Sequence, residues 1–346
     1  MNVKTTNRNI LKCAQLKKNF TYSMDVAELE PVIDGAFVDN DLFDLKTNNE
    51  LFQKFVSEKL HLSSEEYNNI FNPLKQLSSF DFLENPYLKN ISLPEITSGN
   101  IKIERAFYKK NEFTIIDEPK QSSNLLRKYS IGVFDNEAFT YVLRSPEFVW
   151  MSINPMEINT ARQAISNAYG NVLVLGGGLG YYPYMVSLKE NVTSVTIVEA
   201  NSSIKNLLEA IIIPQFPGKK VTIIHDDAYD FLKRSTPWKF DSVYIDTWKD
   251  NVDGAADYKK FMKYESIHPD SHFDYWLENS ILDDTIVNIY QYFSAKLGTE
   301  EYQKYFSMIA PDLWSYLETI HDTISRPEQM DYYLTRIYAK QVLKNI

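Results

Sequence analysis

The chain has 346 residues, of which 44% are hydrophobic and 24% charged, and a formal net charge of -10 at pH 7. This composition is that of a globular protein, and the length suits a core domain with one or two appended parts. The negative charge disfavours nucleic acid as a partner, because phosphate backbones would be repelled. The single cysteine, Cys13, excludes an intrachain disulfide and a cysteine-rich metal site.

The N-terminal segment is basic but lacks the continuous apolar run of a secretory signal. No apolar run approaches the roughly 20 residues that a membrane helix needs. We therefore expect a soluble, cytoplasmic protein that does not enter a membrane.

Residues 1–95 are predicted to be mostly helical, because apolar residues recur at three- and four-residue spacing in 49–60 and in 64–77. Ser63, followed by acidic residues, is typical of a helix start. Prolines and a polar run ending at Asn100 then favour a domain boundary near residue 95.

Residues 96–150 change character, since apolar and polar side chains now alternate. The alternation surrounds a polar turn at 109–111 and another at 135–136. This pattern predicts two β-hairpins ahead of the core.

Residues 151–256 are predicted to form the core. A helix beginning at Pro155 precedes four short strands with helical segments between them. The expected strands are 171–176, 195–200, 221–226 and 240–246. Strict alternation of strand and helix indicates an α/β, Rossmann-like fold: a mostly parallel sheet with helices on both faces. Residues 257–346 are predicted to be helical, with 272–293 as the longest helical stretch, and no fifth core strand is identified.

The first core strand runs into a glycine-rich loop, Gly176-Gly177-Gly178-Leu179-Gly180. Glycine allows a sharp turn and a close approach of the backbone to a ligand. The dinucleotide fingerprint GxGxxG is not present, because Tyr181 stands where its third glycine is needed. The loop is instead GxGxG, the form found in class I methyltransferases. A turn without a ligand is the alternative interpretation.

Acidic residues follow the next three strands, and the carboxyl ends of parallel strands share one edge of a sheet. Glu199 is expected to accept hydrogen bonds from ribose hydroxyls. Asp227 is expected to accept from an adenine amino group, beside the small Ala228, or to cap the next helix. Asp246 is expected to lie nearest the reacting group.

These motifs resemble those of the class I S-adenosylmethionine-dependent methyltransferase superfamily, and within it the spermidine synthase-like branch. The similar segments are VLVLGGGLG, VTIVEAN with Glu199 and Ala200, DDAYDFL and FDSVYIDT. The resemblance covers about a third of the chain and implies S-adenosylmethionine as the cofactor.

The chain departs from the synthase pattern at two places. Leu179 stands where the synthases carry an acid in the glycine loop. Thr247-Trp248-Lys249-Asp250 stands where they have Ser/Thr-Asp-Pro after the fourth-strand acid. Methyl transfer to a small or amine-bearing molecule is therefore the leading hypothesis. Aminopropyl or related alkyl transfer, and cofactor binding without catalysis, are the alternatives.

Asp246 is the candidate catalytic residue, and Glu157, Tyr181 and Trp248 are candidates for binding the substrate. Each has a structural alternative: Glu157 as an acid in a first helical turn, and the aromatic residues as core packing. The acidic stretch from Asp246 to Asp257 attracts an amine substrate or forms a solvated loop. The flanking helical regions are expected to form a lid or a homodimer surface.

Histidines at 268 and 272 are separated by one helical turn, which is a zinc-ligand spacing. Pro269 directly after the first of them favours a helix start instead, and no third ligand is in view. No metal site is predicted.

Overall fold

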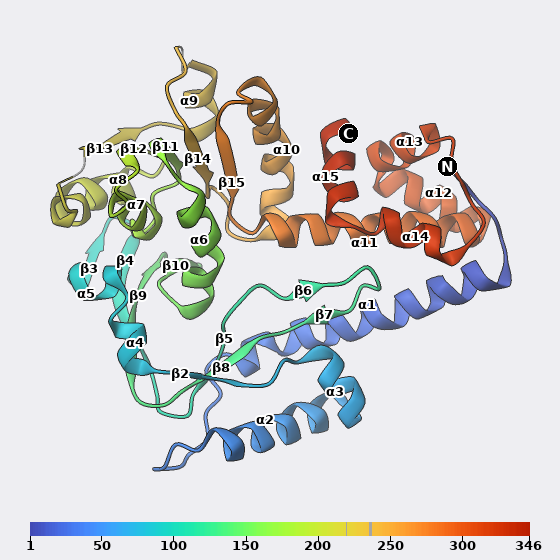
Figure 1. Ribbon diagram of the computed structural model, residues 1–346, viewed down its shortest axis with the longest axis horizontal. Coiled ribbons are helices and arrows are strands. Elements are labelled where there is room, and N and C mark those ends of the chain that lie inside the picture. The colour runs from blue at the N-terminus through green and yellow to red at the C-terminus, as the bar shows by residue number, and fades with distance from the viewer. Residues whose placement is uncertain (219, 235–236) are drawn as a thin grey trace.

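The computed structural model describes residues 1–218, 220–234 and 237–346. A sheet domain occupies one side of the molecule, and helices from the C-terminal part occupy the other (Figure 1). The long N-terminal helix runs below the C-terminal helices toward the strands that precede the core sheet, and both chain termini lie among the C-terminal helices (Figure 1).

The core is a five-stranded parallel sheet with the order β13-β12-β11-β14-β15. Its strands are β11 (Gly170–Leu175), β12 (Val192–Glu199), β13 (Lys220–His225), β14 (Ser242–Ile245) and β15 (His272–Tyr275). The run Val172 to Leu175 is wholly buried, as expected for a strand covered on both faces. The chain steps outward from β11 in one direction and then in the other, so the strand order reverses between β11 and β14. This topology confirms the predicted Rossmann-like class.

The crossover helices cover both faces of this sheet. Right-handed crossovers put the helices after β11 and β12 on one face and those after β13 and β14 on the other. They are α7 (Tyr181–Ser187), α8 (Ser202–Leu207) with a π turn (Leu208–Ile212) and a 3-10 turn (Ile213–Gln215), α9 (Ala228–Arg234) and α10 (Asn251–Ile267). The predicted helix before the sheet is α6 (Pro155–Asn167), which packs against α7 and β15.

The fifth strand corrects the sequence-based expectation that none exists. β15 pairs with β14 in parallel, with Val243 opposite Phe273. Its four residues, His272 to Tyr275, directly precede a long helix that begins only at Glu278, so the strand was absorbed into the expected helix. A short strand at the edge of a sheet carries little periodicity of its own. The sheet therefore extends past residue 256.

The strands upstream of the core exist as predicted, but they do not pair as the two expected hairpins. β4 (Ile101–Tyr108) pairs with β9 (Ala138–Arg144), and β5 (Phe113–Ile115) pairs with β8 (Ile131–Phe134). Residues 101–115 and residues 131–144 thus run antiparallel to each other. Asn111, at a φ of 61°, donates its N–H to the carbonyl of Phe134 and is buried between them. Alternation identifies a strand but not its partner, which explains the error.

These strands belong to three small sheets with the orders β10-β9-β4-β3, β2-β8-β5 and β6-β7. The remaining members are β2 (Lys75–Leu77), β3 (Ile96–Ser98), β6 (Lys120–Gln121), β7 (Arg127–Lys128) and β10 (Val149–Ser152). Hairpins do precede the core, formed by β3 with β4 and by β9 with β10.

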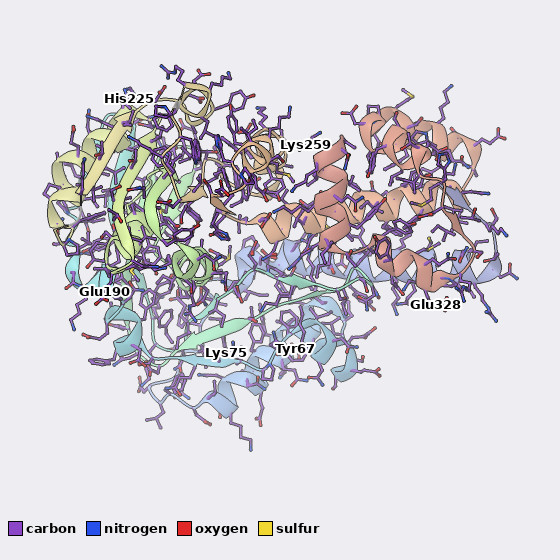
Figure 2. All side chains as sticks on the ribbon, turned by 45° about the horizontal axis from the view of Figure 1, so that its top comes forward. Tyr67, Lys75, Glu190, His225, Lys259 and Glu328 are labelled. Carbon is purple, nitrogen blue, oxygen red and sulfur yellow. The ribbon has the colours of Figure 1, made fainter. Side chains whose placement is uncertain are left out.

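The N-terminal region is mainly helical, as expected, with α1 (Asn7–Ile33), α2 (Leu45–Leu60), α3 (Ser64–Ile70), α4 (Ser79–Leu83) and α5 (Pro86–Asn90). Ser63 caps α3 in a capping box with Glu66. The helix predicted over 64–77 is shorter, because Pro73 disfavours helical backbone just before it and the chain continues as β2. Figure 2 marks Tyr67 of α3, which belongs to a second hydrophobic core.

Helix α1 joins the two cores, since Leu16 is buried in the main core and Val26 in the second. The C-terminal region packs on it through α11 (Glu278–Leu297) and α14 (Pro327–Tyr333). The other elements here are α12 (Glu300–Ile309), α13 (Pro311–Thr319), α15 (Arg336–Asn345) and the parallel pair β1 (Asn2–Val3) and β16 (Thr323–Ile324). Among the described residues, every helix is too short or too polar to cross a membrane.

Candidate functional site

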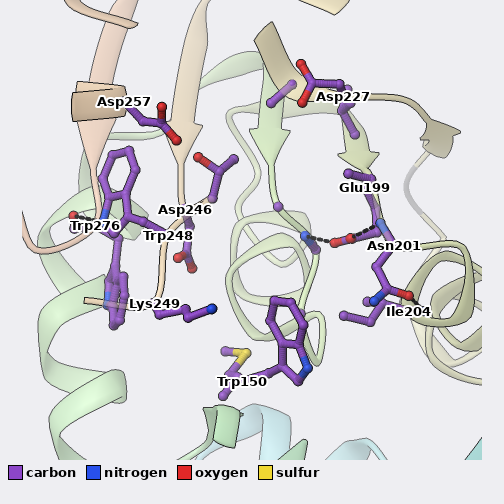
Figure 3. A pocket seen from close by; sticks show the side chains of 18 of the residues that line it. Trp150, Glu199, Asn201, Ile204, Asp227, Asp246, Trp248, Lys249, Asp257 and Trp276 are labelled. Carbon is purple, nitrogen blue, oxygen red and sulfur yellow. Dashed lines mark hydrogen bonds between the residues drawn. The ribbon is translucent and has the colours of Figure 1, made fainter. Parts of the chain in front are cut away.

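A cavity of about 550 Å³ lies at the carboxyl end of the core sheet, where the strand order reverses. Its size is in the range of ligand pockets. Figure 3 shows carboxylates, indole rings and a lysine around it. Of the residues predicted to form the site, those that line it are Glu157, Gly176, Gly177, Gly178, Glu199, Ala200, Asp227, Ala228, Asp246 and Trp248.

The glycine loop is shaped by contacts within the protein. Gly176 has a φ of 92°, and a Cβ atom there would lie 1.8 Å from the carbonyl oxygen of Asp246. Gly178 has a φ of 48°, and its Cβ would lie 2.6 Å from the Sδ of Met151. Larger residues are therefore excluded at both positions, and the loop backbone keeps its close approach to β12 and β14.

Gly180 is not part of the cavity lining. It adopts a left-handed conformation as the N-cap of α7, where a Cβ would lie 2.9 Å from Ile212. Its role in the structure is to let α7 start close to the segment after α8.

Glu199 holds the loop in place from the end of β12. Its Oε2 accepts a hydrogen bond from the N–H of Gly177 at 2.9 Å, and its Oε1 accepts one from Asn201 at 2.7 Å. The side chain is buried, which raises the pKa of the carboxyl, while the backbone N–H donors act in the opposite direction. A carboxylate has about four acceptor positions, so Glu199 retains capacity for a further donor, such as a ligand hydroxyl.

Asp227 caps the next helix and also lies at the cavity. Its Oδ1 accepts from the N–H of Asp230 at 2.9 Å and so caps α9, and the exposed side chain also lines the cavity. Ala228 and Tyr229 line the cavity beside it. A planar ring placed here would meet a small side chain and a carboxylate together.

Glu157 and Asp246 are the two carboxylates of the cavity that accept no hydrogen bond and form no ion pair among the described residues. Glu157 reaches the cavity from the first turn of α6, and Asp246 directly follows β14. Burial raises the pKa of Glu157 to about 8, and the charge of Asp246 adds to this. Burial likewise raises the pKa of Asp246 to about 7, with a contribution from Glu199. Both side chains are partly buried, and neither forms an ion pair within the described part of the chain.

Aromatic side chains form the wall beyond these acids. Trp248, Phe261 and Trp276 are buried, and the indole Nε1 of Trp248 donates to the carbonyl of Trp276 at 3.1 Å. The indole Nε1 of Trp276 is itself buried and finds no acceptor among the described residues. The hydrogen bond from Trp248 to the Trp276 carbonyl connects the segments that follow β14 and β15.

Several lining residues were not identified from the sequence: Trp150, Met151, Asn201, Tyr229, Lys249, Lys260, Phe261 and Trp276. Trp150 and Met151 lie on β10, and the N–H of Leu179 contacts the Met151 sulfur at 3.2 Å. Trp276 directly follows the strand that was missed. Lys249 was noticed only as a departure from the synthase motif, although its place after a strand-end acid was itself an indication.

Tyr181, a predicted substrate residue, does not line the cavity. It is buried, its ring packs edge-on against Tyr87, and its hydroxyl accepts from the Asn85 side chain at 3.3 Å. This matches the packing alternative considered for it. The two histidines of the zinc-like spacing lie in different surroundings, since His268 stacks on Trp238 and His272 pairs with Asp274.

No protein-family model and no curated protein matches the sequence. Among solved structures, the chain is similar to spermidine synthase from Thermotoga maritima, at 13% identity over 35% of this chain and 45% of that one, with a TM-score of 0.28. A spermidine synthase in complex with the transition-state analogue AdoDATO gives 15% identity over 35% and 43%, with a TM-score of 0.26. MNMC2 from Aquifex aeolicus gives 12% identity over 86% of this chain and 100% of that one, with a TM-score of 0.29.

The aligned part spans less than half the length of either synthase. The fold class rests on the strand order, and the activity has to be inferred from the cavity.

Proposed function

We propose that this protein is an S-adenosylmethionine-dependent methyltransferase that acts on a small, amine-bearing molecule. The observation that carries the proposal is the arrangement of carboxylates in the cavity. Glu199 and Asp227 lie at its nucleoside end, which we define as Glu199, Asn201, Asp227 and Ala228. Glu157 and Asp246 lie at its transfer end, which we define as Glu157, Asp246, Trp248 and Lys249.

The chemistry of the two ends fits this cofactor. Glu199 offers acceptor oxygens to neighbouring ribose hydroxyls, and Asp227 with Ala228 suits an adenine ring. Carboxylates without cations suit a positively charged centre, because a nearby positive charge stabilises their ionised form. A neutral or anionic ligand would leave Glu157 and Asp246 uncompensated.

When bound, S-adenosylmethionine supplies an electrophilic methyl group on a positively charged sulfur. The residues of the chain then have two tasks: to align the acceptor and to exclude water. The buried rings of Trp248, Phe261 and Trp276 provide a dry wall for this, and their faces attract an alkylammonium group.

An amine acceptor reaches the site mainly as an ammonium ion and has to lose a proton before its nitrogen can attack. Asp246, whose pKa is raised to about 7, is matched to this task near neutral pH. The proton passes from the amine nitrogen to an Asp246 carboxylate oxygen, and the nitrogen lone pair becomes available. Glu157, whose pKa is raised to about 8, ionises when a cation binds beside it and so favours binding of the cation.

Incubation of the purified protein with methyl-labelled S-adenosylmethionine and a panel of amines tests the proposal. We expect label in an amine product and S-adenosylhomocysteine as the by-product. Release of methylthioadenosine would instead identify alkyl transfer of the aminopropyl type. Binding of the cofactor without any turnover across the panel would favour a non-catalytic binding protein.

A further inference from the structure

The two lysines that line the cavity differ in their partners. The Nζ of Lys260 lies 2.7 Å from Asp257, so an acid already balances its charge. The Nζ of Lys249 lies 4.2 Å from the ring centre of Phe148 and forms no ion pair with any described residue. Lys249 is thus a cation at the cavity without an anion to balance it.

Lys249 extends into the cavity on the side where Trp150 lies, as Figure 3 shows. The rings of Phe148 and Trp150 are in contact, with centroids 4.6 Å apart, so the β9–β10 hairpin holds the ammonium group against the cavity mouth. A ring face attracts a cation but accepts no N–H hydrogen bond of ordinary strength. The donors of Lys249 therefore remain available for a ligand.

Trp276 also lines the cavity, and Trp248 connects the two segments through the hydrogen bond to the Trp276 carbonyl. The buried indole N–H of Trp276 has no acceptor within the described residues. Buried polar groups are rarely left unpaired in folded proteins. The donors of Lys249 at the cavity suit a ligand that brings an acceptor group, and its charge indicates an anion.

Glu157 and Asp246 show the opposite requirement, since they are carboxylates without a cation. One ligand group carries both a cation and an anion on adjacent atoms: the α-amino acid end of a molecule. A cavity with acids on one side and an unpaired lysine on another is complementary to such a group.

We propose that Lys249 binds the α-carboxylate of S-adenosylmethionine while Glu157 binds its α-ammonium group, which leaves Asp246 for the amine of the acceptor. The site therefore selects the carboxylated cofactor and rejects its decarboxylated form. This inference rests on the proposed function and deepens it, because aminopropyl transfer requires the decarboxylated form. Lys249 is thus the residue that determines which group is transferred.

Isothermal titration calorimetry with S-adenosylmethionine and with decarboxylated S-adenosylmethionine tests this directly. We expect the wild-type protein to prefer the carboxylated ligand by about 10- to 100-fold, the value of a hydrogen bond to a charged group. Lys249→Met keeps the unbranched stem and removes the charge, so the preference should fall toward equality. Lys249→Glu should reverse it. Lys263→Met is the matched control, because Lys263 is exposed on the same helix as Lys260 and does not line the cavity.

The outcomes separate this inference from the proposed function. Equal binding of both ligands to the wild-type protein, or an unchanged preference in Lys249→Met, would overturn the role of Lys249 and leave the methyltransferase proposal standing. An unchanged preference together with a raised KM for the acceptor would assign the carboxylate to the acceptor instead. No heat with either ligand or with S-adenosylhomocysteine at saturating concentration would overturn both proposals. Thermal unfolding of each variant verifies that the fold is kept.

Discussion

The nucleoside end and the transfer end of the cavity both present carboxylates, but they hold them in different ways. At the nucleoside end, Glu199 and Asp227 accept hydrogen bonds from backbone N–H groups. At the transfer end, the Glu157 and Asp246 carboxylates accept none from any described residue. The acids of the nucleoside end therefore order the backbone around them before a ligand binds. Burial of the acids of the transfer end lowers the stability of the folded protein, and a cationic ligand offsets this loss.

The largest effect that tests this contrast is expected from Asp246→Asn. An amide cannot accept the proton of an ammonium acceptor, so kcat should fall by about 10²- to 10⁴-fold. Steady-state formation of S-adenosylhomocysteine measures it. Asp270→Asn, at an exposed position outside the cavity, should keep the wild-type rate. An undiminished kcat in Asp246→Asn would remove Asp246 from the proton transfer.

Glu199→Gln tests the nucleoside end of the cavity. Both oxygens of Glu199 accept backbone N–H groups, so an amide places its own N–H₂ against one of these donors and disturbs the loop. The Kd for S-adenosylhomocysteine should rise by about 10- to 100-fold. Glu209→Gln, at an exposed acid paired with Lys205, should leave it unchanged. Equal Kd values for Glu199→Gln and the wild type would show that this end does not hold the nucleoside.

The pH dependence of binding sharpens the comparison further. The raised pKa values of Glu157, about 8, and Asp246, about 7, leave these carboxyls partly protonated in the free protein at neutral pH. A cationic ligand favours their ionised form, so binding releases protons and affinity increases with pH. Between pH 6 and 8 the Kd for S-adenosylmethionine should fall by about tenfold or more, since one group contributes about a factor of ten per pH unit below its pKa.

Calorimetry at pH 6, 7 and 8, in buffers with different ionisation enthalpies, measures both the affinity and the protons released. The double variant Glu157→Gln/Asp246→Asn should show a flat profile. Affinity that decreases with rising pH would contradict the assignment of the cation to these acids.

The smallest effect is expected on stability. The pKa of Glu157 is raised in the folded protein, so folding loses stability as pH rises from the ordinary value of 4.5 toward about 8. Glu157→Gln does not titrate and should be more stable than the wild type at pH 8, by about 1–2 kcal/mol, with little difference at pH 4. Urea unfolding at the two pH values measures this. A variant that is less stable at pH 8 would mean that the Glu157 carboxyl has a stabilising partner.

The part of the fold that the sequence predicts well is the part specified by local pattern. Glu199, Asp227 and Asp246 each follow a short apolar strand, and parallel topology brings such positions to one edge without further information. Pairing between distant segments has no local signature, so the partners predicted for β4 and β8 were wrong. The same limit explains why Trp276 was not identified. It reaches the cavity because it follows β15, and that strand is too short to show a periodic pattern. Tyr181 has the right place in sequence but points into the packing around Tyr87.

The close approach of Gly176 to the carbonyl of Asp246 fixes the ends of β11 and β14 relative to each other at the edge of the sheet where the cavity lies. The contact joins main chain to main chain, so exchanging a neighbouring side chain cannot create room for a larger residue at position 176. A methyl group introduced there would have to displace the very acid assigned to proton transfer. Tolerance to substitution should therefore be lower at this glycine than at Gly180, where the nearest obstacle is a side-chain methyl group of Ile212 and not the main chain.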